Sequence, residues 1–230
     1  MKQYNGEKGI ISLTSWKGRI NTVCKTLFSL LQQCPEYHIV LVLSEEEFPK
    51  KEKELPENLM LFVENNLIEI LWVYKNYKSF KKILFTMEKY RNIPVISADD
   101  DCLYKYNYAD ELFKQWETNK NKAVTQSASF GSGFGVLMTY DMIKNYEQFL
   151  NNQVIATNHD DLFYRFLLIK NGIKCSFLHY RNELVGKEVE FNSTDGISSG
   201  INELKNIEIF NKVFNTKLTI KHIGDYVFWK

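Results

Sequence analysis

The stretch Ile93-Pro94-Val95-Ile96-Ser97-Ala98-Asp99-Asp100-Asp101 joins an apolar run to three consecutive aspartates. The apolar run predicts a buried strand, so the aspartates would emerge where that strand ends. Adjacent carboxylates repel one another and lose hydration when buried, unless a cation lies among them. Aspartates also favour turns and helix N-termini, but three in a row exceed what capping needs. We interpret the triplet as a site for a hard divalent cation that is shared with substrate phosphates.

Apolar runs alternate with helical patterns over the first hundred residues. Four runs predict buried strands, at 9–13, 38–43, 68–73 and 93–98. Two helical patterns lie between them, one over 23–31 and one over 80–87 with Ser79 as its cap. The mixed-charge segment 44–58 predicts a loop or a short exposed helix. This alternation indicates β-α-β units and a mainly parallel sheet with helices on both faces.

The second half of the chain continues with shorter elements. Strands are expected at 123–127, 136–139 and 173–178, and helices at 109–116, 141–150 and 160–170, followed by a further helix around Phe210 and Phe214. Asn171-Gly172 is a typical left-handed stop for the helix at 160–170. The polar segment 192–200 fits either a lid over a bound substrate or a plain linker.

Length and composition narrow the class of protein. A chain of 230 residues fits one domain with a substantial core. The formal net charge of +1 gives no general attraction to nucleic acid. The four cysteines are scattered without a CxxC pair, which favours a reducing compartment. The polar start of the chain and the absence of a long apolar run indicate a cytoplasmic protein with at most peripheral membrane contact.

Several polar segments fall where predicted elements begin or end. They are Thr14-Ser15-Trp16-Lys17-Gly18-Arg19, Lys78-Ser79-Phe80-Lys81-Lys82, the aspartate triplet and His159-Asp160-Asp161. Phe130-Gly131-Ser132-Gly133-Phe134-Gly135 adds small residues that let a backbone approach a ligand, flanked by aromatic rings. Because ligands of open α/β sheets bind at the carboxyl ends of the strands, we expect these segments to form one site.

With these motifs in this order, the chain resembles the GT-A-fold glycosyltransferases over about residues 10–178. It is most similar to the small bacterial family-2-like enzymes of surface polysaccharide and lipopolysaccharide assembly, whose DXD motif matches the aspartate triplet. The resemblance implies a single α/β, Rossmann-like domain with a mainly parallel central sheet flanked by helices. Residues 1–101 would form the nucleotide-sugar-binding half. Residues 102–230 would form the acceptor-binding half and a C-terminal segment.

The same resemblance implies roles for residues of the donor site. Contacts with the nucleotide-sugar, preferentially a UDP-sugar, fall to Thr14, Ser15, Arg19, Lys82, Asp99 and Asp100. Asp101 would be the principal ligand of a Mn²⁺ or Mg²⁺ ion, with Asp99 as a second ligand, while either Asp99 or Asp100 would contact the ribose or the sugar. The cation and Lys82 would stabilise the charge that grows on the leaving diphosphate.

On the acceptor side, the resemblance places a saccharide or lipid-linked saccharide near Gly133, Phe134 and His159. Asp161 would be the general base that activates the acceptor hydroxyl for inversion in one displacement, and Asp160 is the alternative base. His179 and His222 are weaker candidates for a third metal ligand. The protein would work in the cytoplasm, at or near the inner face of the membrane.

Two other classes of function compete with glycosyl transfer. Nucleotidyl transfer to a sugar phosphate would also use carboxylates, a metal and lysine, but the chain has no Gly-rich, Arg-bearing phosphate loop after its first strand. A non-catalytic module that binds glycans or Ca²⁺ would account for acidic loops. Two separate acidic motifs around a Gly/aromatic segment favour the transferase.

Overall fold

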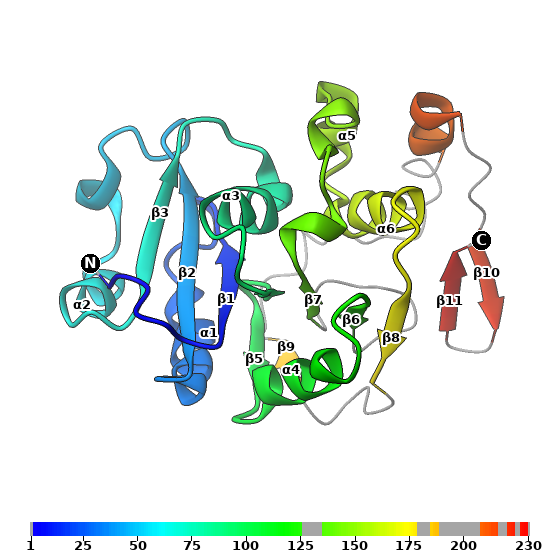
Figure 1. Cartoon of the computed structure of the whole chain (residues 1–230). Coiled ribbons are helices and arrows are strands. Elements are labelled where there is room, and N and C mark those ends of the chain that lie inside the picture. Colours follow the sequence, from blue (N-terminus) through cyan, green and yellow to red (C-terminus); the bar gives the residue numbers. More distant parts are fainter. Residues whose placement is uncertain are drawn as a thin grey trace.

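The computed structural model describes residues 2–125, 135–178, 185–188, 208–215, 220–223 and 226–229. Its main sheet contains seven strands: β1 (Gly9–Thr14), β2 (Tyr37–Ser44), β3 (Glu69–Val73), β4 (Val95–Ser97), β6 (Ala123–Thr125), β7 (Val136–Met138) and β8 (Cys175–Phe177). They lie in the order β3-β2-β1-β4-β7-β6-β8 (Figure 1). The strand pattern predicted from the sequence is therefore confirmed.

The sheet is mainly parallel. β1 pairs in parallel with β2 and β4, β2 with β3, and β6 with β8, whereas β7 runs antiparallel to both β4 and β6. The chain builds β1, β2 and β3 outward in one direction and then returns to place β4 on the other side of β1. The carboxyl ends of β1 and β4 are thus a topological switch point, where open α/β sheets bind their ligands.

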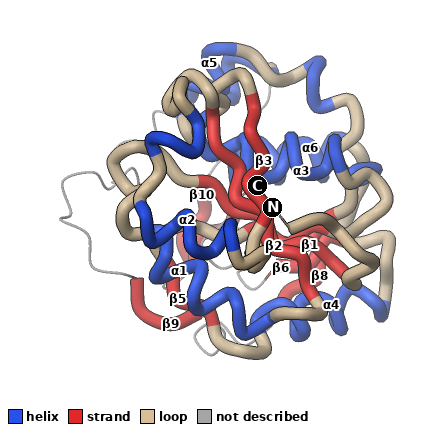
Figure 2. Tube along the Cα trace, turned by 90° about the vertical axis from the view of Figure 1, so that its left-hand side faces the viewer, coloured by secondary structure: helices blue, strands red, loops and turns tan. Residues whose placement is uncertain are grey.

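Helices cover both faces of this sheet. Their bounds are α1 (Val23–Leu30), α2 (Glu57–Glu64), α3 (Lys81–Lys89), α4 (Tyr108–Thr118), α5 (Asn152–Thr157) and α6 (Asp160–Lys170). Figure 2 shows α3 and α6 on one side of the strands and α1, α2 and α4 on the other. Short 3-10 turns occupy Leu31–Gln33, Lys51–Glu54, Lys78–Phe80, Tyr140–Met142 and Tyr146–Gln148.

Smaller elements complete the described part of the chain. β5 (Cys102–Tyr104) pairs antiparallel with β9 (Val185–Glu188), and β10 (Ile220–Ile223) forms an antiparallel pair with β11 (Tyr226–Trp229). A helix over 208–214 buries Phe210 and stacks Phe214 on Phe166 of α6, with ring centroids 4.2 Å apart. Among the described residues, no helix has the length and apolar character needed to cross a membrane.

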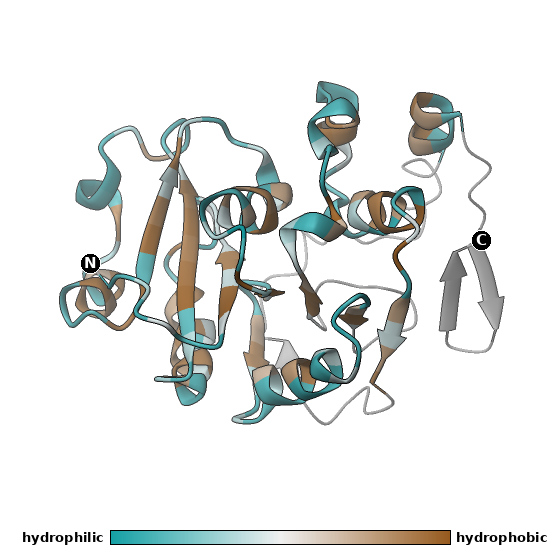
Figure 3. Cartoon of the chain, viewed as in Figure 1, coloured by the Kyte–Doolittle hydropathy of each residue, from teal (hydrophilic) through white to brown (hydrophobic). Residues whose placement is uncertain are grey.

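The core lies between the helices and the strands. β2 is buried along its whole length, as expected for a central strand of a parallel sheet. Figure 3 shows β2 as mainly hydrophobic and most of the loops around it as hydrophilic. The helices bury one apolar stripe each, such as Ile83, Leu84 and Met87 on α3. This packing holds the carboxyl ends of β1 and β4 in fixed positions.

Some local predictions were wrong. Ser79 does not cap α3; it lies in the preceding 3-10 turn, and its hydroxyl donates to the backbone carbonyl of Asn158 (3.3 Å). The helix expected over 141–150 is replaced by two 3-10 turns, because Asn145 has a left-handed backbone (φ 63°) that a continuous helix does not allow. The sequence reading also missed α2 and β5. Gly172, with φ 69°, does follow α6 as predicted.

Candidate active site

The aspartate motif leaves β4 beside the end of β1, and two tyrosines fix its backbone. The backbone N–H of Asp99 donates to the Tyr104 hydroxyl (2.8 Å). The Tyr108 hydroxyl donates to the carbonyl of Ser97 (2.5 Å), the last residue of β4. Because both tyrosines are buried, the point at which the carboxylates leave the sheet is rigid.

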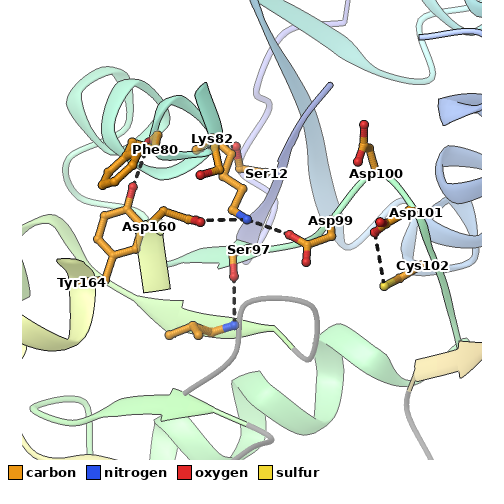
Figure 4. A network of polar contacts seen from close by, with 12 residues as sticks. Ser12, Phe80, Lys82, Ser97, Asp99, Asp100, Asp101, Cys102, Asp160 and Tyr164 are labelled. Atoms are coloured by element: carbon orange, nitrogen blue, oxygen red, sulfur yellow. Dashed lines mark hydrogen bonds and ion pairs between the residues drawn. The ribbon is translucent and has the colours of Figure 1, made fainter. Parts of the chain in front are cut away.

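The middle aspartate is an interior residue. Asp100 is only 6% exposed and accepts hydrogen bonds from the Ser15 hydroxyl (2.6 Å) and from Arg19 Nη1 (2.9 Å). Burial raises the pKa of Asp100, although Ser15 and Arg19 act in the opposite direction. Figure 4 shows its side chain pointing away from Asp99 and Lys82. Asp100 therefore anchors the loop after β1, and its burial leaves Asp99 as the better candidate for a sugar contact.

Arg19 joins the buried aspartate to an exposed one. The same Nη1 atom lies 2.7 Å from Oδ2 of Asp101, whose side chain is 26% exposed. Burial alone would lower the pKa of Arg19, but Asp100 and Asp101 raise it, so the guanidinium stays charged. The Cys102 thiol donates to the other oxygen of Asp101 (3.7 Å). This corner of the site thus pairs a cation with a carboxylate that solvent and ligands can reach.

Lys82 connects the aspartate motif to α6. Its ammonium lies 2.6 Å from Oδ1 of Asp99 and 3.1 Å from Oδ2 of Asp160, and its side chain is 3% exposed (Figure 4). Burial alone would lower the pKa of Lys82, but Asp160 and Asp99 raise it well above its ordinary value. The Ser12 hydroxyl of β1 donates to the Lys82 carbonyl (2.5 Å). One buried cation therefore fixes the two acidic motifs relative to each other.

The start of α6 is held by a clasp from the 3-10 turn that precedes α3. The Ser79 N–H donates to the side-chain oxygen of Asn158 (3.2 Å), a residue whose left-handed backbone (φ 54°) turns the chain into α6. The Tyr164 hydroxyl donates to the Phe80 carbonyl (2.8 Å). In the first turn of α6, Asp160 is buried and Asp161 is partly exposed. The two acidic residues therefore face different surroundings.

The remaining predicted site residues have varied placements. The Thr14 hydroxyl donates to the Val42 carbonyl of β2 (2.7 Å). The partly buried His159 directly precedes α6, and its N–H donates to the Thr157 hydroxyl (3.2 Å). Gly133, Phe134, His179 and the segment 192–200 lie outside the described residues, and for His222 only the backbone is described.

Sequence reasoning missed several residues that build the site. Tyr104, Tyr108 and Asn158 carry no motif that would single them out, since their partners lie on other elements. Gly135 is described at the end of the glycine segment with φ 80°, and a Cβ there would lie 2.2 Å from the Tyr108 hydroxyl. The segment 44–58, predicted as a loop or a short exposed helix, places Glu47 3.5 Å from the buried amine of Lys81. Gly135 was not missed, because it belongs to the segment 130–135 whose small residues the sequence analysis singled out.

Asp99 and Asp101 fit a divalent cation that protein and substrate hold together. No three His, Cys, Asp or Glu side chains converge on a metal site within the part of the chain that the structure describes. Protein cations, Lys82 and Arg19, already lie against these two carboxylates, and both carboxylates remain 26% exposed. A Mg²⁺-like ion that completes its shell with phosphate oxygens and water needs only one or two carboxylates. The carboxylates of Asp99 and Asp101 therefore suit such an ion, and they do not enclose it.

Comparison with known proteins gives a likeness of fold. No protein-family model matches the sequence, and no curated protein matches it. A mannosyltransferase from Pyrobaculum calidifontis, solved with GDP-Man and Mn²⁺, is similar over 91% of this chain, with a TM-score of 0.64 and 10% identity. Two structures of residues 1–349 of S. aureus TarS are also similar. The complex with UDP matches 91% of this chain, with a TM-score of 0.59 and 10% identity, and the complex with UDP-GlcNAc matches 90%, with a TM-score of 0.59 and 13% identity.

The likeness covers part of those proteins. This chain spans 65% of the mannosyltransferase chain, and 72% and 65% of the two TarS chains. The mainly parallel sheet and its flanking helices are the part of the fold that matches these structures. The chain thus has the GT-A-type fold of these glycosyltransferases.

Proposed function

We propose that the protein is a glycosyltransferase that moves a sugar from a nucleotide-sugar to a saccharide acceptor. The observation that carries this proposal is the pair of acidic motifs at the switch point, held together by the buried Lys82. One motif offers exposed carboxylates to a donor, and the other opens a helix that faces the same point. Structures of similar fold were solved with GDP-Man, UDP and UDP-GlcNAc, which supports a nucleotide-sugar donor here.

On the donor side, the chain must offset the charge of a leaving nucleoside diphosphate. Arg19 is the partly exposed cation of the motif and is our candidate for contact with the diphosphate. A Mn²⁺ or Mg²⁺ ion held by Asp99 and Asp101 would supply further charge neutralisation on the leaving group. Lys82 is almost fully buried between Asp99 and Asp160, so we assign it to positioning these carboxylates.

On the acceptor side, a carboxylate must remove the proton of the attacking hydroxyl. Asp160 is 4% exposed and paired with Lys82, so it cannot readily meet an acceptor. Asp161 is the next residue, lies in the same first turn and is partly exposed. We therefore assign the general base to Asp161 and a structural role to Asp160. Attack opposite the leaving diphosphate would invert the anomeric configuration in one displacement.

The finer assignments extend the same proposal. The acceptor would be a saccharide or lipid-linked saccharide near Gly133, Phe134 and His159, and a UDP-sugar is the favoured donor. Thr14 and Ser15 border the donor site, where their hydroxyls hold β2 and Asp100 in place. The setting would be glycan assembly for a bacterial surface, in the cytoplasm or at the inner face of the membrane.

A turnover assay tests the proposal. The protein is incubated with UDP-, GDP-, CMP- and dTDP-sugars, Mn²⁺ and simple saccharides, and released nucleotide and glycosylated product are measured. Asp161→Asn should lower turnover about 10³-fold, in the range of lost general-base catalysis. Asp141→Asn, which changes an exposed carboxylate on a 3-10 turn, should leave turnover unchanged. Release of a sugar 1-phosphate in place of free nucleotide, or full activity of Asp161→Asn, would contradict the proposal.

A further inference from the structure

The two ion pairs of Arg19 differ in how readily they can be broken. Its contact with Asp100 lies in the interior, where the Ser15 hydroxyl also binds that carboxylate (2.6 Å). Its contact with Asp101 (2.7 Å) involves a side chain that is 26% exposed. Solvent and ligands therefore compete for Asp101 far more easily than for Asp100.

Asp101 is also the carboxylate expected to bind a metal ion. A divalent ion on either oxygen of Asp101 would lie close to the guanidinium that already occupies Oδ2. Two cations that share one carboxylate repel each other, and the surrounding protein screens this repulsion less than water does. Arg19 therefore opposes metal binding for as long as it stays on Asp101.

Lys82 cannot act at Asp99 as Arg19 acts at Asp101, as a cation that leaves its carboxylate when a ligand arrives. It is 3% exposed and lies between two carboxylates, so leaving Asp99 would mean moving a buried charge. The Arg19 side chain is 21% exposed, and its backbone is fixed by the Thr22 hydroxyl, which donates to the Arg19 carbonyl (2.9 Å). The backbone of Arg19 need not move for Asp101 to become available. Because the same Nη1 atom also binds Asp100, the guanidinium has to turn so that another of its five N–H groups stays on Asp100.

We propose that Arg19 is an internal counter-ion of the aspartate motif, which keeps metal affinity low in the empty protein and moves to the diphosphate when donor and metal bind together. The second half of this statement rests on the proposed function. A diphosphate offers Arg19 more negative charge than Asp101 does, so the arriving donor frees Asp101 for the metal. The metal and the nucleotide would then bind with positive coupling.

The test is a Mn²⁺ titration of the metal-free protein without nucleotide, followed through the electron paramagnetic resonance signal of free Mn²⁺. Arg19→Gln should bind Mn²⁺ about tenfold more tightly than wild type, because the competing charge is gone. Lys17→Gln removes a positive charge from the same loop, where Lys17 pairs with Glu54 (3.3 Å), and should change the affinity by less than about twofold. Equal or weaker Mn²⁺ binding by Arg19→Gln would overturn the proposal.

Further variants guard against a folding defect, because Arg19→Gln leaves the buried Asp100 without its cation. Arg19→Gln with Asp100→Asn removes both partners and is compared with Asp100→Asn alone; the double variant should again bind Mn²⁺ about tenfold more tightly. Arg19→Lys keeps the charge and should stay within about threefold of wild type. A double variant that gains no Mn²⁺ affinity over Asp100→Asn would overturn the proposal.

A second titration, with UDP or GDP present, separates this inference from the proposed function. Nucleotide should tighten Mn²⁺ binding to wild type, and the gain should be smaller in Arg19→Gln. If neither UDP nor GDP binds to wild type, the titration is repeated with CMP and dTDP. Failure of all four nucleotides ends the proposed function and the release of Arg19 by donor, whereas the nucleotide-free titration still decides the counter-ion role. If nucleotide binds and its gain is the same in both proteins, the exchange of Arg19 fails and the proposed function stands.

Discussion

The two ends of the central sheet both bury charge, but they satisfy it in different ways. At the amino end, Glu69 of β3 contacts His38 Nε2 (2.7 Å), Lys89 Nζ (2.6 Å) and the Tyr90 hydroxyl (2.6 Å). Burial alone would raise the pKa of Glu69, but these three partners lower it to about 2. At the carboxyl end, burial raises the pKa of Asp100 in spite of its partners.

This contrast shows that buried charge alone does not mark an active site. The amino-end cluster is closed, since side chains of the protein surround Glu69 and leave it 4% exposed. That end also has a hollow of about 390 Å³, lined by residues such as Asn5, Lys8 and Glu36. The carboxyl end instead leaves Asp99 and Asp101 26% exposed at the switch point. Exposed carboxylates beside buried cations are the better sign of function.

The largest effect should come from breaking the carboxyl-end cluster at Lys82. Lys82→Met removes the cation between Asp99 and Asp160 and should cost about 3–5 kcal/mol of unfolding free energy. Turnover of the folded protein should fall at least about a hundredfold, because both acidic motifs lose their fixed spacing. Urea unfolding and turnover assays measure the two effects.

Lys89→Met is the matched change at the amino end. The Lys89 side chain is 45% exposed, so the loss of its pair with Glu69 should cost no more than about 1 kcal/mol, with turnover unchanged. An equal loss of turnover in both variants would show that the two clusters do not differ in function.

The next effect concerns stability alone. Glu69→Gln should lower the free energy of unfolding at pH 7 by about 3 kcal/mol and leave turnover intact. Because the folded pKa of about 2 lies below the ordinary value of 4.5, the contribution of Glu69 is complete above about pH 4.5 and is lost as the pH falls toward 2. Urea unfolding between pH 6 and pH 3 should therefore show a flatter acid limb in Glu69→Gln than in wild type; parallel limbs would contradict this account.

The smallest effect should come from the clasp between the 3-10 turn before α3 and the start of α6. Ser79→Ala removes the bond from the Ser79 hydroxyl to the Asn158 carbonyl (3.3 Å) but keeps the backbone bond, so stability should fall by about 0.5–1 kcal/mol. Turnover should fall by about two- to fivefold, because the clasp positions the start of α6. Thr118→Ala, which removes an exposed hydroxyl bond on α4, serves as the control and should leave turnover unchanged. If Thr118→Ala lost as much turnover as Ser79→Ala or more, the clasp would have no special role in positioning α6.

Much of the fold could be predicted because it depends on local patterns. Apolar runs located β1 to β4, and helical spacing located α1, α3, α4 and α6. Predictions failed where a single backbone conformation decided the outcome, as at Asn145, or where a residue had a tertiary partner, as Ser79 has in Asn158. The periodicity of hydrophobic residues carries no information on either.

The candidate site was only partly predictable for a related reason. The aspartate triplet was visible, but three identical neighbours do not reveal which one is buried. Ser15 and Arg19 settle this, because they bind Asp100 from the loop after β1. In the same way, the ion pair between Lys82 and Asp160 joins distant parts of the sequence. Only the packing of α6 against α3 could show that Asp160 is held and that Asp161 is partly exposed.

Calorimetric titration of wild type and Asp101→Asn with UDP-, GDP-, CMP- and dTDP-sugars, first with Mn²⁺ and then with a chelator, tests whether a donor binds at the aspartate motif. One nucleotide class should bind in the presence of Mn²⁺, and the chelator or Asp101→Asn should weaken this binding at least about tenfold. Failure of every nucleotide to bind with any metal, or equal binding by Asp101→Asn, would contradict a donor site at the carboxyl ends of β1 and β4.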